Sequence, residues 1–170
     1  MRKNNKLSYS DIKKLEMLLN KIPDRKKISS RTLGKIITIL GKHLTKIQGY
    51  SVFSTVLKRE IRETGKSDAN FLSKILRIEN VTPETIKLVI NSAAILLGLK
   101  LGIRNGKVVA LECPFYEALK EYEEPFMCNA CVEYNKGIAE ELTNDKFTVK
   151  RVKWFFDGDN CCIFKPIRKV

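Results

Sequence analysis

The chain has 170 residues, of which 44% are hydrophobic and 30% charged, and its formal net charge is +13. This length and composition are typical of one globular domain that can bury a proper core. No run reaches the roughly 18 apolar residues needed to span a bilayer, and the basic residues 1–5 precede no apolar segment. We therefore expect a cytosolic protein without a secretory signal, in which thiols stay reduced.

The positive charge is concentrated in the first part of the chain. Residues 1–60 hold 15 basic and 4 acidic residues, whereas residues 108–170 hold 9 basic and 11 acidic ones. Such a basic half fits nucleic acid or another acidic partner, and it equally fits a Lys-rich, well-solvated surface. We divide the chain into a basic N-terminal helix and linker, residues 1–28, and a ligand- or metal-binding region, residues 29–170, within one globular domain overall.

The first half is predicted to be helical. Apolar residues spaced by three and four predict helices over 9–21, from 29 or 30 to about 48, over 51–63, and from 67 or 68 onward. Gly65 is the expected end of the third of these helices. The first two, joined by the short charged linker 23–27, also fit a helix-turn-helix, although most helix pairs bind no DNA.

Two further features of the helical half lead to predictions. His43, the only histidine, lies at the edge of an apolar face formed by Leu40, Leu44 and Ile47. It either completes a metal site or is a partly buried histidine bonded to backbone. Thr82, Pro83 and Glu84 mark the start of a further helix, as an N-cap, a proline at the first turn and an acid. The apolar face of that helix makes it the central one; it comprises Ile86, Val89, Ile90, Ala93, Ala94 and Leu97.

After residue 98 the hydrophobic period changes to that of strands. Asn105-Gly106 between apolar segments 99–104 and 107–113 predicts a two-residue hairpin, with Cys113 on the buried face of Val109 and Leu111. A helical turn over 115–121 and a helix over 129–143 follow, and Gly137 inside that helix predicts a close backbone contact. Strands 147–156 and 161–167 form a second hairpin around residues 157–160. The fold class is therefore α+β, with a helical N-terminal half packed on a four-stranded antiparallel sheet in a ββ-α-ββ half.

The five cysteines are Cys113, Cys128, Cys131, Cys161 and Cys162. Cys128 and Cys131 share one helix face, just after Pro125 and close to Asn129, the expected cap. Amides at a helix N-terminus lower a thiol pKa and favour thiolate, the form that binds metal. One C-x2-C supplies half of a tetrahedral zinc set.

The other two candidate ligands are Cys113 and Cys162. Neighbouring strand residues face opposite sides, and Cys162 shares its side with Phe164, so we prefer Cys162 to Cys161. The predicted metal ligands are thus Cys113, Cys128, Cys131 and Cys162. The alternatives are inert core thiols, a redox-active dithiol or a disulfide.

Cys131-x5-Gly137 and Gly158-Asp159-x2-Cys162-x-Phe164 are the features in which the C-terminal half resembles the 4-vinyl reductase domain family. Cys113-Pro114-Phe115 followed by the C-x2-C is similar to relatives described as thiazoline carboxylate hydrolase-like. The resemblance covers residues 35–168 loosely and is specific from residue 113. It implies a fold similar to that of the vesicle-tethering TRAPP subunits, usually dimeric and sometimes with an acyl-binding channel.

The same resemblance implies a small-molecule-binding domain whose cysteines hold a metal. Family members often carry another cysteine on the strand before the Gly-Asp turn, where this chain has Trp154, Phe155 and Phe156. A metal site here would therefore need Cys113 or the C-x2-C in its place.

These patterns lead us to expect a sensor or regulatory domain that binds a metal, with zinc as the candidate, and a small hydrophobic or cyclic ligand, in a homodimer. One alternative is a reductase or hydrolase acting on a small cyclic substrate at a cysteine–metal site; another is a DNA-linked regulator that uses residues 1–60. No catalytic residue is assigned, because there is no phosphate-cradling glycine loop, paired-carboxylate motif or Ser/His/Asp pattern.

Overall fold

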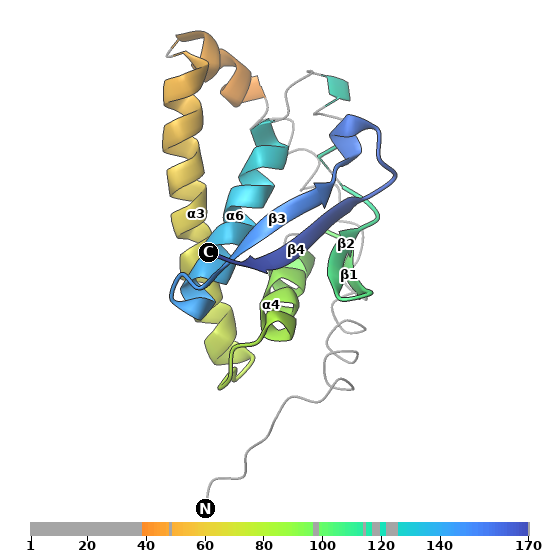
Figure 1. Ribbon diagram of the computed structural model, residues 1–170. Coiled ribbons are helices and arrows are strands. Elements are labelled where there is room, and N and C mark those ends of the chain that lie inside the picture. The colour runs from red at the N-terminus through yellow and green to blue at the C-terminus, as the bar shows by residue number, and fades with distance from the viewer. Residues whose placement is uncertain are drawn as a thin grey trace, which may run out of the picture.

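The computed structural model describes residues 39–47, 49–96, 99–113, 115–116, 120–121 and 126–169 (Figure 1). The helix expected over 9–21, the boundary between residues 28 and 29, and Pro125 lie outside these residues. Residues 39–47 are helical, as expected for the end of the second predicted helix. No helix in the described ranges is both long and apolar enough to cross a membrane.

The apolar face predicted on the helix of residues 39–47 is not buried. Leu40, Leu44 and Ile47 are all exposed, and so is His43 beside them. The spacing of three and four correctly indicated a helix, but it could not say whether another element covers that face.

A single helix, α3 (Tyr50–Ile75), replaces the two helices predicted on either side of Gly65. That prediction was wrong because the glycine is needed for a crossing rather than for a helix end. A Cβ on Gly65 would collide with the backbone carbonyl of Tyr134, and a Cβ on Gly137 would collide with the carbonyl of Arg62. The close backbone contact predicted at Gly137 is thereby confirmed, and Gly65 is its counterpart on the facing helix.

Polar contacts fix the same crossing between α3 and α6 (Phe126–Thr143). The guanidinium of Arg62 donates to the Glu133 carboxylate, and the hydroxyl of Tyr134 donates to Asp68 Oδ2 at 2.6 Å. Burial raises the pKa of Glu133, but hydrogen bonds from Lys136 and Arg62 lower it more, so the pKa lies below the ordinary 4.5. These contacts hold α6 in place, and α6 carries Cys128 and Cys131.

The helix α4 (Pro83–Leu96) begins where the sequence predicts. The amide of Thr85 donates to Thr82 Oγ1 at 3.3 Å, and the amide of Thr82 donates to Thr85 Oγ1 at 3.2 Å. This reciprocal pair is a capping box in which threonine takes the usual place of glutamate. The middle of α4 is buried on all sides, from Ile86 to Ala94, as expected for the central helix.

The four strands form one antiparallel sheet in the order β1-β2-β4-β3, which confirms the predicted fold class. The strands are β1 (Leu101–Arg104), β2 (Lys107–Ala110), β3 (Phe147–Lys153) and β4 (Cys162–Arg168). Positive φ angles of 48° at Asn105 and 67° at Gly106 give the predicted two-residue turn. Strand β2 ends at Ala110, so Leu111 is exposed and does not continue the buried face.

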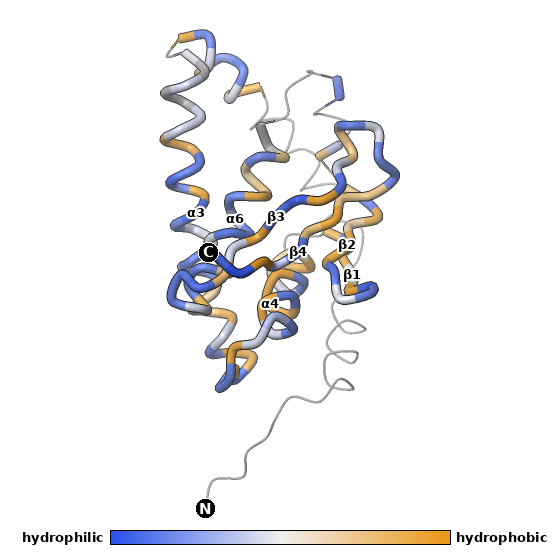
Figure 2. The backbone as a smooth tube through the Cα atoms, viewed as in Figure 1, coloured by the Kyte–Doolittle hydropathy of each residue, from blue (hydrophilic) through white to orange (hydrophobic). Residues whose placement is uncertain are grey.

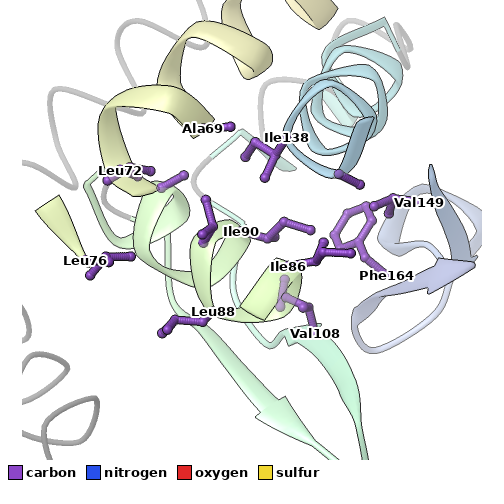
Figure 3. Close-up of a cluster of buried hydrophobic side chains, with 14 of the residues drawn as sticks. Ala69, Leu72, Leu76, Ile86, Leu88, Ile90, Val108, Ile138, Val149 and Phe164 are labelled. Carbon is purple, nitrogen blue, oxygen red and sulfur yellow. The ribbon is translucent and has the colours of Figure 1, made fainter. Parts of the chain in front are cut away.

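The helices cover one face of this sheet. Helices α4 and α6 lie against the strands, and α3 packs on the far side of α6 (Figure 1). Hydrophobic residues are concentrated in α4 and the strands facing it, whereas α3 alternates between hydrophobic and hydrophilic turns (Figure 2). In Figure 3 the core lies where these layers meet; it includes Ala69, Leu72, Ile86, Ile90, Val108, Ile138, Val149 and Phe164.

Candidate functional site

The two hairpins and the first turns of α6 bring cysteines from distant parts of the sequence to one end of the sheet. Cys128 and Cys131 lie in the first two turns of α6, and Cys162 is the first residue of β4. Cys113 follows β2, whose Ala110 pairs with Cys162. The ladder between β2 and β4 therefore joins the segments that carry the two distant cysteines.

The four predicted ligand thiols are close enough to influence one another. Burial raises the pKa of Cys131, and the charges of ionised Cys113, Cys128 and Cys162 raise it further. Burial likewise raises the pKa of Cys113 to about 11, and Cys162 contributes to that shift. Within the described residues, however, no group of three or more Cys, His, Asp or Glu side chains is already arranged to hold a metal ion. Within the described residues the four thiols therefore form no preformed metal centre.

The expectation of low-pKa thiols at the start of α6 was wrong. Burial raises the pKa of Cys128 to about 12, although the Trp154 side chain and the charge of Arg151 act in the opposite direction. The helix begins at Phe126, so Asn129 is inside it and is not its cap. Desolvation of the charged form outweighs the helix N-terminus here, so these thiols are protonated at neutral pH unless a cation joins them.

Cys162 rather than Cys161 lies on the buried face of β4, together with Phe164, as the strand alternation predicts. Cys161 is half-buried, and the thiol it influences is its neighbour Cys162. His43 is exposed on the helix of residues 39–47. The exposed histidine therefore does not share the buried face on which Cys162 lies.

Two of the four sulfurs have an N–H donor. The backbone amide of Phe155 donates to Cys162 Sγ at 3.5 Å, and Asn135 Nδ2 lies 4.0 Å from Cys131 Sγ. At Cys113 the acceptor is the backbone carbonyl, to which the amide of Tyr116 donates at 3.2 Å.

Such donors have a chemical meaning. A neutral thiol is a weak acceptor, whereas a thiolate is an anion that N–H groups stabilise strongly. The N–H donors at Cys131 and Cys162 would therefore stabilise those two sulfurs more as thiolates than as thiols. The indole N–H of Trp154 is buried and has no hydrogen-bond partner within the described residues.

A short 3₁₀ turn supplies one of these donors. Strand β3 ends at Lys153, three residues earlier than predicted, and η1 (Phe155–Asp157) follows. Gly158 has φ 89°, and Asp159 Oδ2 accepts a hydrogen bond from the backbone amide of Trp154 at 2.9 Å. The Gly158-Asp159 pair therefore closes the turn that presents the Phe155 amide to Cys162.

Reasoning from the sequence missed all of these donors. The backbone amides carry no sequence signal, and the aromatic residues read as strand. Asn135 could have been predicted as a donor, because it lies four residues after Cys131 on the same face of α6. In the structure it is buried.

No protein-family model matches this chain, and neither does any curated protein. A crystal structure of the phenol-responsive sensory domain of the transcription activator PoxR, with phenol, is similar in fold. The TM-score is 0.61 at 13% sequence identity, over 79% of this chain and 74% of that one. At this identity the likeness shows a shared fold, and the narrower resemblance to the 4-vinyl reductase family remains a prediction.

Proposed function

We propose that this chain is a sensory domain that binds a small molecule and that contains a closed metal centre made by Cys113, Cys128, Cys131 and Cys162. The observation that supports the metal proposal is that the segments carrying these cysteines lie at one end of the sheet, where Cys162 is buried and the other three thiols are half-buried. The fold shared with a phenol-responsive sensory domain supports the sensory part.

The donor set indicates the metal. Four cysteine sulfurs select a soft or borderline ion in tetrahedral geometry, and zinc is the first candidate. Bound zinc would tie the hairpin β1–β2, the start of α6 and the start of β4 together, with no coordination position left open for a substrate. A centre with four protein ligands is a structural one. For this reason we favour a sensory role over the reductase or hydrolase alternative.

Binding would draw the four sulfurs together and release their protons. Because burial raises the pKa of Cys113 to about 11 and that of Cys128 to about 12, the metal-free thiols are neutral. Metal affinity should therefore rise with pH, as it does wherever thiols must lose protons to bind.

Metal analysis of protein purified without chelators tests the centre. We expect about one zinc per chain, with four of the five cysteines protected from a thiol reagent until the metal is removed. Less than half an equivalent of metal, together with five freely reactive thiols in the native protein, would remove the proposal. The matched variants are Cys128→Ser, which should lower the melting temperature of the metal-loaded protein, and Cys161→Ser, which should not.

We propose that the small molecule binds between the helices and the sheet. The phenol-responsive sensory domain of similar fold was crystallised with phenol, so phenol and other small cyclic compounds are the first probes. A ligand at a hundred times its dissociation constant stabilises the folded state by about 2.7 kcal/mol, which a thermal-shift assay resolves easily. A saturable rise in melting temperature supports the proposal, and no shift with any compound of such a panel counts against it.

A further inference from the structure

Four cations form one row across the outer face of the sheet, the face turned away from α4 and α6 (Figure 1). Arg104 pairs with Lys107 across the β1–β2 ladder, and Lys150 pairs with Lys165 across the β3–β4 ladder. The β2–β4 register, continued by one residue, places Lys107 beside Lys165. Each strand therefore contributes one residue to this cation row.

The cation row points away from the core because strand side chains alternate between the two faces of a sheet. The residues next to it in sequence include Val108, Val149 and Phe164, which are buried in the core. Of the four cations, Lys107 is half-buried and the other three are exposed. The charged groups are therefore open to a partner that approaches the sheet from outside.

Within the described residues no ion pair joins the cation row to a carboxylate. Glu112 makes an ion pair with Lys100 at 3.1 Å, and Asp159 makes one with Lys153 at 3.6 Å. Like charges directly opposite each other on two strands destabilise a sheet, and the row contains such a pair in each hairpin. The excess is local, because residues 108–170 hold more acidic than basic residues. A bound anion would offset the repulsion.

The surroundings of the row favour contact through charge alone. The uncharged residues next to it on the outer face are all buried or half-buried; they are Gly102, Val109, Thr148, Ile163 and Ile167. None is an aromatic residue on which an unpaired base could stack, and none is an exposed large apolar side chain that would insert into a membrane. These properties favour a partner with a regular array of negative charges.

The dimensions of the row match one strand of a DNA duplex. Neighbouring strands of a sheet lie about 4.8 Å apart, so a row across four strands spans about 14 Å. One DNA strand carries a phosphate about every 3.4 Å along the helix axis, which gives about four phosphates over that length. The number of cations therefore equals the number of phosphates that the row can reach.

We propose that the cation row of Arg104, Lys107, Lys165 and Lys150 is a docking surface for double-stranded DNA. Contacts to phosphates position a protein on the duplex and carry no sequence information, so binding is independent of base sequence. This surface is separate from the basic residues 1–60, and it does not depend on the proposed metal centre.

Fluorescence anisotropy of the full chain with a labelled duplex of about 20 base pairs tests this surface. The logarithm of the affinity falls with the logarithm of salt concentration by about 0.9 for each phosphate neutralised. Four such contacts weaken binding about 150-fold between about 50 and 200 mM salt, and two weaken it about 12-fold. The slope therefore counts the cations that contact the duplex.

The test variant combines Lys150→Gln with Lys165→Gln, and its slope should be less steep than that of the wild type by about 1.8. Lys58→Gln combined with Lys74→Gln is the matched control, because both residues are exposed on α3 and the change of charge is the same. We expect this control to keep the wild-type slope. Replacing the two sheet lysines by arginine instead should also keep it, since the charge is retained.

Three results would overturn the proposal. The wild type would fail to bind the duplex at low salt, the sheet variant would keep the wild-type slope, or the α3 control would lose as much as the sheet variant. Labelled polyglutamate is run in parallel; if it binds and the duplex does not, the row docks an acidic protein and the DNA proposal is wrong. Should the double variant not fold, the single variants decide, with an expected loss of about 0.9 in slope for each.

Discussion

Replacing Gly65 by alanine tests the close crossing of α3 and α6. In an exposed helix position alanine is better than glycine by about 1 kcal/mol. At Gly65 the new Cβ would overlap the Tyr134 carbonyl, which belongs to backbone and cannot rotate away. Overpacking of this kind destabilises by about 1–3 kcal/mol. If the helices separate, the hydrogen bonds of Arg62 to Glu133 and of Tyr134 to Asp68 weaken as well, each worth about 1 kcal/mol.

The net expectation for Gly65→Ala is therefore a loss of about 2–4 kcal/mol in the free energy of unfolding, measured by urea denaturation. Ser67→Ala is the matched control, because Ser67 is exposed two residues later on the same helix. We expect that change to stay within about 0.5 kcal/mol of the wild type. A Gly65→Ala variant at least as stable as the wild type would refute the close crossing. The higher helix propensity of alanine would then not be outweighed by a clash with the Tyr134 carbonyl.

Three further changes test other parts of the structure. Thr82→Ala removes the cap of α4 and should lower the free energy of unfolding by about 1 kcal/mol in urea; no change would show that the capping box is not formed in solution. Glu133 has a folded-state pKa below 4.5, so its contribution is present above pH 4.5 and is lost as the pH falls through the lower, folded-state pKa. As the pH falls below 4.5, metal-free wild-type protein should therefore lose more free energy of unfolding than Glu133→Gln, and parallel pH profiles would contradict this. Cys162→Ser should abolish metal uptake whereas Cys161→Ser should leave it intact, and the reverse result would mean that the wrong thiol was assigned.

The fold could be predicted from local patterns because those patterns agree with the packing. The Asn105-Gly106 turn and the Thr82-Pro83 helix start each have one chemical meaning, and both occur as predicted. Gly65 was misread because the same residue serves equally well as a helix end or as a point of close approach. Only the position of the facing helix distinguishes the two.

The site was predicted less completely than the fold. The strand period correctly placed Cys162 on the inner face, whereas the meeting of the four candidate thiols stays a prediction. The sequence did not show that burial would outweigh the helix N-terminus at Cys128, because desolvation depends on elements far away in the chain.

Other expectations stay predictions. The homodimer, the DNA-linked role of residues 1–60 and the identity of the ligand are not tested by the described residues. The enzymatic alternative also stays a prediction. Four cysteine ligands favour a closed metal centre, and an activity assay is the measurement that tests for turnover.

The central claim is that four sulfurs from Cys113, Cys128, Cys131 and Cys162 close around one metal. X-ray absorption at the zinc edge, on protein loaded with one equivalent of zinc, measures the ligand set directly. We expect a shell of four sulfur atoms at about 2.3 Å, falling to three when Cys113 is changed to serine. A shell dominated by nitrogen or oxygen, or a four-sulfur shell that survives Cys113→Ser and Cys162→Ser alike, would contradict it.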